Sequence, residues 1–547
     1  MAASNQTSGE GPGGGSFSPL VMACFTLNYI VGTGFLALPW AFYQAGWLLS
    51  GAVLVGVCAA ANVGSDYILS AMARAERIVQ SRDQSVVGED SNGVSGRESV
   101  ISLTDLSHDE NTSLVQKSPE DDSPAVSCEG GENATSSADT YGTVPPSRQM
   151  NEFDDDTAGC SEAGPLLVGK RMIDLPELCR LFLGVWGFRG YGFCVSYYLY
   201  GALWSFTSVF GSALALNLPA SLQGGDTYAM SVFIFALIVG PMSFMDLDEQ
   251  KAVQVVLSGG RIVMIILMII TPLIAALCTL DMGTPHFDDQ TSPMGAPATS
   301  AGGISRMMPV VVYAAIFHFS IPSLAEEVTD KARVGEVFGL TFILCGTLYT
   351  FIGGIGAWYF GAGIEQSANL NWGPYHGGTG RLIPGGGENG GEDLWVDVAF
   401  WAKALSKFVV MFPALNVISA FPLHTFSLGR SLMGIYYGEN VHKAEKNRRI
   451  KSVFRAISCV PPLIGGLFVR DLGTITGFAG LAGLAIAFCF PAMLYIGSER
   501  AMKDRFGASA PLRTRYQRFG SSSLIAAGVL AFGTVSIVVV FFSLILT

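Results

Sequence analysis

The chain has 547 residues, of which 50% are hydrophobic and only 14% are charged. Long windows such as 190–216, 335–360 and 522–546 hold few or no charged residues, and they exceed the roughly 18 residues that are needed to cross a bilayer. This composition argues against a soluble enzyme and predicts an all-α, multi-pass membrane protein. The net charge of −12 does not indicate a nucleic-acid partner, because residues 81–170 alone carry 18 Asp and Glu against 5 Lys and Arg.

The apolar windows predict about eleven transmembrane helices. In chain order these are 19–41, 47–71, 190–216, 228–246, 256–280, 307–325, 335–360, 399–428, 453–470, 472–497 and 522–546. With the N-terminus in the cytosol, 27 of the 32 Lys and Arg, Arg261 among them, fall in cytosolic segments, as the positive-inside rule requires. We therefore expect a cytosolic N-terminus and an extracellular or lumenal C-terminus, in the plasma membrane or in a vacuolar or lysosomal membrane.

Two hydrophilic segments lie outside the transmembrane helices. Residues 1–18 are rich in Gly and Ser and are expected to be a disordered cytosolic N-terminus, followed by helices 1 and 2 in residues 19–73. Residues 74–171 are acidic and poor in aromatic residues, which predicts a disordered cytosolic insert before helices 3 to 11 in residues 172–546. We expect residues 81–170 to be a solvated tether, and the alternative is that the Ser and Thr clusters beside acidic residues there bind cytosolic protein partners or kinases. Residues 174–184 are expected to form a short amphipathic helix on the inner surface.

The first span contains helix breakers, because Gly32, Thr33 and Gly34 occur together and Pro39 follows. Broken backbone is tolerated inside a membrane only where protein or a water-filled cavity covers it. The N–H groups of a half-helix that begins near Gly34 suit a carboxylate, and the carbonyls that end near Val31 suit an ammonium group or a cation. Small residues also permit close helix packing. The spacing alone leaves a binding site and a packing contact equally open.

The sixth span is interrupted as well. Its centre reads Phe317-His318-Phe319-Ser320-Ile321-Pro322, and Pro322 cannot donate a hydrogen bond to the carbonyl one turn back. Broken first and sixth helices, five spans apart, are typical of a transporter with inverted repeats and a binding site at the membrane midplane. The sequence therefore predicts a 5+5 inverted repeat and one extra C-terminal helix.

Several stretches resemble the amino acid/auxin permease family, the eukaryotic amino acid transporter domain of the LeuT-type fold. They are NYIVGTGFLALPWAF in the first span, ELCRLFLG before the third, PVVVYAAIFHFSIPSLAEEVTDK in the sixth, FPLHTFSLGRSL at the end of the eighth and GTITGFAGLAGLAIAFCFPAMLYI in the tenth. The resemblance covers about residues 19–73 and 172–546. It implies secondary active transport of an amino acid, by symport with H+ or Na+.

The resemblance also implies residue roles. Gly32, Thr33 and Gly34 would bind the substrate carboxylate, and carbonyls around Ile30, Val31 and Phe317 would bind its amino group. The substrate side chain would lie against the aromatic rings of Phe317, Phe319 and Trp204. The remaining polar contacts would come from Asn28 in the first span and from His318 and Ser320 in the sixth.

The coupling ion follows less directly. Asn28 matches an Asn that helps to hold substrate or ion in sodium-coupled members, but the eighth span, MFPALNVISAFP at 411–422, offers only Asn416 and Ser419 as nearby oxygen ligands. We therefore expect H+, with Na+ as the alternative. His318 is a candidate proton carrier because an ionisable group at mid-membrane is costly. The alternative is a neutral histidine that braces the broken helix.

Other functions remain as alternatives. The same pocket would serve an amino-acid sensor that signals through the insert, and a channel or a permease for another small acid is a third possibility. No P-loop, HExxH or CxxC motif occurs in a soluble segment, so we expect neither an enzyme nor a metal site or cofactor. The expected partners are the amino acid and the membrane lipids.

Overall fold

The fold is that of a computed structural model, which describes residues 22–23, 26–27, 30–90, 165–169, 173–218, 226–244, 251–278, 299–326, 328–383, 394–507, 510–518 and 522–546. The predictions for the N-terminus at 1–18, for most of the insert and for Asn28 lie outside these residues.

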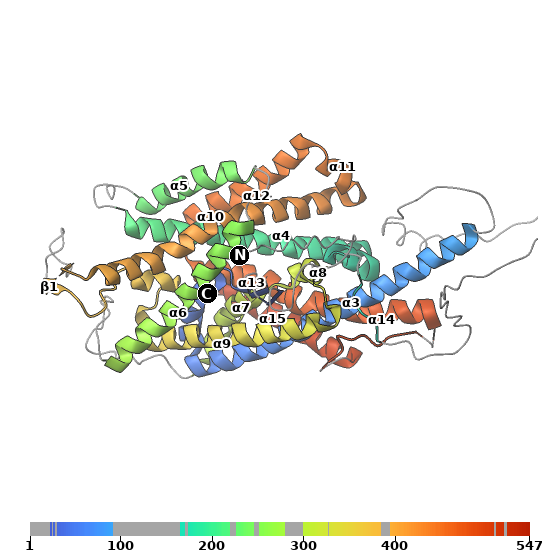
Figure 1. Cartoon of the computed structure of the whole chain (residues 1–547), viewed down its shortest axis with the longest axis horizontal. Coiled ribbons are helices and arrows are strands. Elements are labelled where there is room, and N and C mark those ends of the chain that lie inside the picture. Colours follow the sequence, from blue (N-terminus) through green and yellow to red (C-terminus); the bar gives the residue numbers. More distant parts are fainter. Residues whose placement is uncertain are drawn as a thin grey trace, which may run out of the picture. The chain divides into compact units, whose positions relative to one another are not determined.

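Nine helical segments of the described residues are long and apolar enough to cross a membrane. They are formed by α3 (Trp47–Asp90), α4 (Leu175–Asn217), α6 (Lys251–Cys278), α7 (Ile304–Ala315) with η5 (His318–Ser320) and α8 (Ile321–Glu326), α9 (Val334–Phe360), α10 (Phe400–Tyr437), α12 (Arg448–Phe468), α13 (Leu472–Leu484) with η10 (Ala485–Cys489) and α14 (Phe490–Phe506), and α15 (Ser523–Leu546). The shorter α5 (Thr227–Met242) and a broken first segment with η1 (Gly34–Ala37) and α2 (Leu38–Ala45) complete the set. These segments correspond one to one to the eleven predicted spans (Figure 1).

Short elements connect the long helices. A two-stranded antiparallel hairpin lies between α9 and α10 and is formed by β1 (Arg381–Ile383) and β2 (Leu394–Val396), with Arg381 opposite Val396. The remaining connections are η4 (Ala301–Gly303), η6 (Lys331–Arg333), η7 (Gly361–Gly363), η8 (Ala368–Trp372), η9 (Gly438–Asn440) and α11 (Val441–Glu445). The hairpin was not expected, but the described fold is otherwise helical.

Several helices extend beyond the predicted spans. Helix α3 continues to Asp90, so residues 74–90 are helical although we assigned them to the insert (Figure 1). The reason is local, because residues 72–87 contain neither Gly nor Pro to end the helix. The short helix expected at 174–184 is the beginning of α4, which bends at Gly184, where φ is 70° and ψ is −167°. Such a positive φ is readily adopted by glycine alone.

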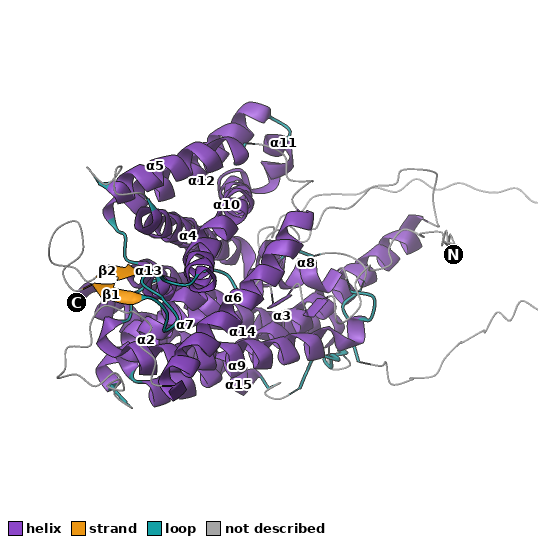
Figure 2. Ribbon diagram, turned by 60° about the vertical axis from the view of Figure 1, so that its left-hand side comes forward, coloured by secondary structure: helices purple, strands orange, loops and turns teal. Residues whose placement is uncertain are grey.

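The two broken segments pack against each other. Helix η1 and helix α2 both contact α7, and α2 also packs on α9 (Figure 2). The most extensive contact between helices joins α4 and α10. Helix α4 is the third span of the first five, and α10 is the third span of the second five. Because five spans separate corresponding members, they run in opposite directions. This arrangement is compatible with the predicted 5+5 inverted repeat, and α15 follows the ten spans as an extra helix.

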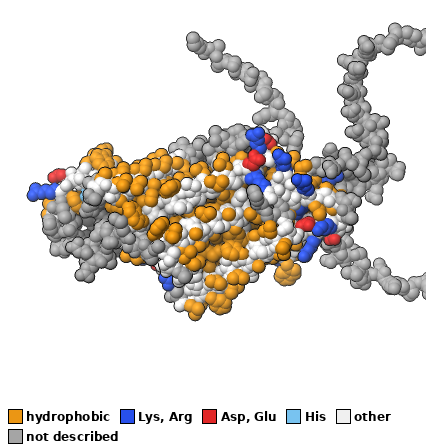
Figure 3. All heavy atoms as spheres, turned by 90° about the horizontal axis from the view of Figure 1, so that it is seen from below, with side chains coloured by type: hydrophobic (Ala, Val, Ile, Leu, Met, Phe, Trp, Pro, Cys, Tyr) orange, Lys and Arg blue, Asp and Glu red, His pale blue; other side chains and the backbone are white. Residues whose placement is uncertain are grey.

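The surface fits a lipid environment. Figure 3 shows a face on which hydrophobic side chains form a broad band, whereas Lys and Arg gather toward its ends. Large apolar side chains are exposed on outward-facing helices, and examples are Leu340, Ile343 and Phe351 on α9 and Val535 and Phe542 on α15. An apolar surface of this extent is unfavourable in water and favourable in a bilayer. The chain is an integral, multi-pass membrane protein.

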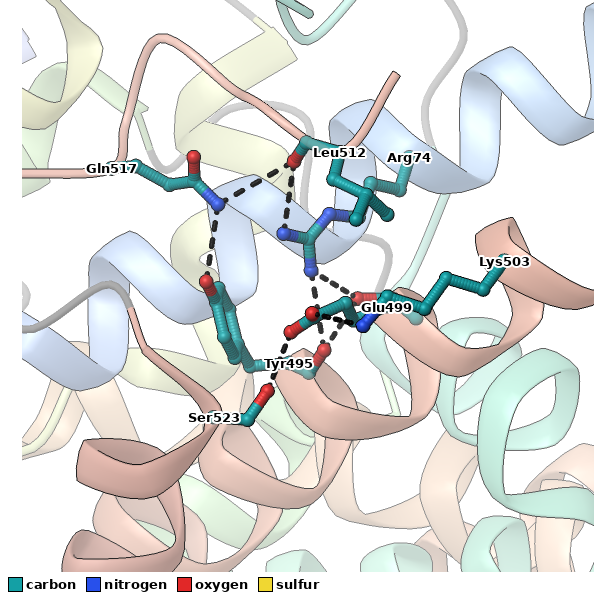
Figure 4. A network of polar contacts seen from close by, with 8 residues as sticks. Arg74, Tyr495, Glu499, Lys503, Leu512, Gln517 and Ser523 are labelled. Atoms are coloured by element: carbon teal, nitrogen blue, oxygen red, sulfur yellow. Dashed lines mark hydrogen bonds and ion pairs between the residues drawn. The ribbon is translucent and has the colours of Figure 1, made fainter. Parts of the chain in front are cut away.

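A buried arginine holds one polar end of the bundle together. Arg74 of α3 is fully buried, and its guanidinium donates to the carbonyls of Tyr495 (3.2 Å) and Leu512 (3.1 Å) and to Ser498 Oγ (3.0 Å) (Figure 4). It also lies over the Tyr495 ring, 4.6 Å from the centroid. Arg74 therefore joins α3 and α14 to the segment at 510–518.

The described end of the insert packs against the same region. Leu166 forms a β-bridge with Thr514, and the Val168 N–H donates to Tyr516 Oη at 3.2 Å. The Gly169 N–H donates to the carboxylate of Glu76. Residues 165–169 are therefore a structured attachment of the insert to α3 and to the segment at 510–518.

An ion pair joins the residue that precedes α5 to the connection between α12 and α13. Asp226 accepts a hydrogen bond from the Ala229 N–H (3.2 Å) and so caps the first turn of α5. Arg470, between α12 and α13, places Nη2 2.5 Å from Asp226 Oδ2. This hydrogen bond from Arg470 lowers the pKa of the exposed Asp226 below its ordinary value.

Candidate functional site

The break in the first span lies at residues 31–33, as predicted. The Gly32 N–H bonds to the Ile30 carbonyl (2.8 Å), which is too close in sequence for a helical bond, and η1 then begins at Gly34. The first bond of η1 runs from the Leu36 N–H to the Thr33 carbonyl (3.1 Å). The N–H groups that precede it at the start of the helix have no helical acceptor, which makes this end attractive to an anion.

The two glycines of the break have different surroundings. A Cβ atom on Gly34 would lie 2.7 Å from Ala314 Cα, so Gly34 is required for the close approach of the first and sixth spans. A Cβ on Gly32 would meet nothing within 4 Å. Gly32 instead lines a small cavity, with Thr33, Phe35, Leu36, Arg261, Met264, Phe412, Pro413 and Asn416. The sequence left packing and binding open, and the structure separates them: Gly34 makes a packing contact and Gly32 faces the cavity.

The break in the sixth span falls at Ile316 and Phe317. Helix α7 ends at Ala315, the Ile316 backbone is extended (φ −82°, ψ 128°), and η5 begins at His318. Pro322 occupies the first turn of α8, where its missing N–H costs no hydrogen bond. The predicted interruption is therefore confirmed, on the N-terminal side of Pro322.

Tyr349 of α9 connects the two breaks. Its hydroxyl lies 3.1 Å from the carbonyl oxygen of Ile30 and 3.1 Å from that of Ala314, and the side chain is fully buried. These are the carbonyls freed where the first span and α7 stop being helical. Sequence reasoning missed Tyr349, because the seventh span carries other hydroxyl groups, such as those of Thr341 and Thr350, and nothing in the sequence singles this one out.

A row of hydroxyl groups joins the first break to α4 and α7. Thr33 Oγ1 lies 3.3 Å from Ser205 Oγ, which lies 2.9 Å from Tyr313 Oη. The ring of Tyr198 packs 5.4 Å from that of Tyr313 and 5.8 Å from that of Phe319. The predicted residues Thr33 and Phe319 are therefore brought to one interface, together with hydroxyl-bearing residues that were not predicted.

Trp204 is placed away from this interface. Its Nε1 donates to the carbonyl of Val469 (3.1 Å), and its ring lies against Gly465 of α12. Neighbouring residues of a helix point about 100° apart, so when Ser205 faces the break Trp204 faces another helix. The residues of α4 that contact the residues beside the two breaks include Tyr198 and Ser205.

An arginine occupies the other side of the first break. Arg261 of α6 is 5% exposed, and its guanidinium donates to the Val31 carbonyl and to Asn416 Oδ1 (2.7 Å). We counted Arg261 among the cytosolic basic residues, and that interpretation is wrong, because its charged group is buried among α6, α10 and the break. Ser419 Oγ donates to the carbonyl of Asn416 in its own helix (3.1 Å).

The remaining candidates in the sixth span face elsewhere. His318 is fully buried, and its Nε2 lies 2.9 Å from the Ala61 carbonyl of α3. Phe317 packs against the rings of Phe338 and Phe342 in α9, at 5.1 and 5.2 Å. The Ser320 N–H closes the turn onto the Phe317 carbonyl (2.8 Å). These contacts hold η5 against α3 and α9, beside the break and not within the small cavity.

Comparisons with known proteins agree with this architecture. Residues 16–86 and 158–541 match the family described as transmembrane amino acid transporter protein. The chain is 23% identical over 518 residues to "Transmembrane protein 104 homolog" of Dictyostelium discoideum, which covers 92% of this chain and 94% of the relative. It is 22% identical over 528 residues to "Transmembrane protein 104" of Homo sapiens, with 91% of each chain covered.

Two further likenesses concern proteins that are named as transporters. "Amino acid transporter AVT6D" of Arabidopsis thaliana is 23% identical over 273 residues, which is 48% of this chain and 55% of the relative. Among solved structures, a manganese transporter of Eremococcus coleocola aligns over 96% of this chain and 95% of its own, with 10% identity and a TM-score of 0.39.

Proposed function

Because the chain belongs to the transmembrane amino acid transporter family, we propose that this membrane transporter is a secondary active carrier of amino acids whose substrate binds at the two helix breaks. The observation that carries the proposal is the pair of broken segments packed side by side, with Gly32 facing a cavity. Alternating access around such a site is the usual mode of folds with inverted repeats.

Each end of the substrate has a matching group at the breaks. The start of η1, at Gly32, Thr33 and Gly34, supplies N–H groups and the positive end of a helix dipole for the carboxylate. Freed carbonyls supply acceptors for the amino group. The Ile30 carbonyl already accepts from the Gly32 N–H and from Tyr349, whereas the Val31 carbonyl bonds to Arg261 and has a second lone pair for the substrate. The hydroxyl of Thr33 and the ring of Phe319 complete the wall toward α4.

The coupling ion in this proposal is H+, with Na+ as the alternative. A sodium site built on the eighth span requires side-chain oxygen ligands directed at the first break, and the side-chain oxygen of Asn416 already accepts from Arg261 (2.7 Å). His318 is the ionisable residue beside the sixth break. His318→Gln retains a donor for the Ala61 carbonyl but cannot carry a proton, so it should abolish uptake driven by a pH gradient and preserve exchange between equal concentrations.

Transport is tested with the purified full-length chain in proteoliposomes. Uptake of a panel of labelled amino acids is measured across a range of pH, with and without a pH gradient and with Na+ or choline outside. We expect saturable accumulation of at least one amino acid driven by the pH gradient. Absence of gradient-driven uptake for every amino acid refutes the proposal.

Two glycine variants locate the site. Gly32→Val places methyl groups in the cavity and should abolish uptake. Gly528→Val, on the exposed face of α15, makes the same change where a Cβ meets nothing within 4 Å and should leave uptake intact. Normal uptake by Gly32→Val would show that the substrate binds elsewhere.

The sensor alternative concerns the insert. Its attachment at residues 165–169 and the helical residues 74–90 are parts of the fold, so the informative deletion removes only residues 91–164. A transporter should keep its uptake after this deletion. A sensor should lose the binding of cytosolic partners to the insert, or the phosphorylation of the insert.

A further inference from the structure

Arg261 places a permanent positive charge at the first helix break. The guanidinium is buried and donates to oxygen atoms of two different transmembrane segments, the backbone carbonyl of Val31 and the side-chain amide of Asn416. An arginine remains charged in a protein interior and is expensive to bury, so its position in the membrane calls for a functional explanation.

The atoms that Arg261 contacts are of the kind that a hard cation prefers. Carbonyl and amide oxygens are typical ligands of alkali and alkaline-earth cations, and a helix break that frees carbonyls is a recurrent cation site in transporters. The Val31 carbonyl comes from such a break, and Asn416 comes from the eighth span that faces it. None of the residues that line the adjoining cavity is acidic.

We propose that the guanidinium of Arg261 is a resident cation that takes the place of a coupling Na+ between the first break and the eighth span. This rests on the proposed function, since it concerns the coupling of that same site. The side chain neutralises the Val31 and Asn416 oxygens without an ion from solution, so transport proceeds without Na+. It also ties α6 to the first break and to α10, so these hydrogen bonds must lengthen whenever the site opens between those helices.

The first experiment measures thermal unfolding of the purified full chain in NaCl and in choline chloride. We expect the wild-type Tm to be the same in both salts. Arg261→Ala should lower the Tm, and millimolar methylguanidinium should restore part of the loss, because a cation that binds the folded state alone stabilises it by mass action. Arg455→Ala is the matched control, since Arg455 is also buried and donates to a carbonyl, that of Phe244 (3.0 Å), away from the cavity.

Three results would overturn the proposal. The first is a wild-type Tm that is higher in NaCl than in choline chloride. The second is an Arg261→Ala protein whose Tm equals that of the wild type or does not rise with methylguanidinium. The third is a rise of the Arg455→Ala Tm with methylguanidinium that equals the rise in Arg261→Ala. Should Arg261→Ala fail to fold, Arg261→Lys and Arg261→Met replace it. Uptake that is Na+-independent in Arg261→Lys and lost in Arg261→Met supports a resident cation, and equal uptake in the two variants contradicts it.

The two proposals fail in different ways. The unfolding measurements need no transported substrate, so they test Arg261 even if no amino acid is taken up. Conversely, amino acid uptake that requires Na+ upholds the transport function and refutes the role of Arg261.

Discussion

Gly34→Ala should push the first helix break away from the sixth span. The added Cβ would lie 2.7 Å from Ala314 Cα and 2.9 Å from Tyr313 Cδ1, where ordinary contact begins at 3.4 Å. Ala314 Cα is main chain, and α7 is buried against α2 and α13, so the strain cannot be relieved by rotating one side chain. Overpacking of this kind costs about 1–3 kcal/mol. The helix propensity of alanine returns at most about 1 kcal/mol, so we expect a net loss of about 1–2 kcal/mol.

Gly32→Ala is the matched control, because the same methyl group two residues earlier meets nothing within 4 Å. Its free energy of unfolding should stay within about 0.5 kcal/mol of wild type. Both variants are compared by equilibrium unfolding in the same detergent. Wild-type stability in Gly34→Ala, or an equal loss in Gly32→Ala, would refute the assignment of Gly34 to packing and Gly32 to the cavity.

Three further predictions concern polar contacts. Tyr349→Phe removes the hydroxyl donor of the buried Ala314 carbonyl, while the Ile30 carbonyl still accepts from the Gly32 N–H, and the change should cost about 1–3 kcal/mol in the free energy of unfolding. Tyr200→Phe, which removes a half-exposed donor, should cost less than about 1 kcal/mol. Arg74→Met should cost about 3 kcal/mol in the same assay, because three acceptors lose a charged donor. The ion pair of Asp226 and Arg470 stabilises the fold fully above the ordinary Asp pKa of 3.8 and less as the pH falls below it, because the folded-state pKa is lowered. The Tm of the wild type should therefore fall more steeply than that of Asp226→Asn between about pH 5 and pH 3, and parallel curves would contradict this.

The order of the spans and the positions of the two breaks could be predicted because their causes are local. An apolar run of sufficient length must cross the bilayer, Gly32 favours a break in the first span, and Pro322 marks the start of the new helix that follows the break in the sixth. The extents of α3 and α4 were less predictable. Hydropathy marks the residues that lie in lipid, but a helix continues beyond them until a residue such as Gly184 allows it to bend or end.

The composition of the site was only partly predictable. Thr33 and Phe319 both contact residues of α4, whereas Trp204 faces α12 and His318 faces α3. Arg261 looked like a residue that flanks a membrane helix, because its position in the sequence does not reveal where its long side chain ends.

Hydropathy and the positions of Gly and Pro were enough to predict that this chain crosses the membrane many times and breaks its first and sixth helices. The side chains that meet at those breaks could not be predicted in this way and depend on tertiary packing. In a soluble helix an apolar stripe shows which side faces the core, but the lipid-facing and core-facing sides of a membrane helix are both apolar. The rotation of each helix about its axis is therefore set by packing. That rotation brings Tyr349, Ser205 and Arg261 to the break from helices far apart in the sequence.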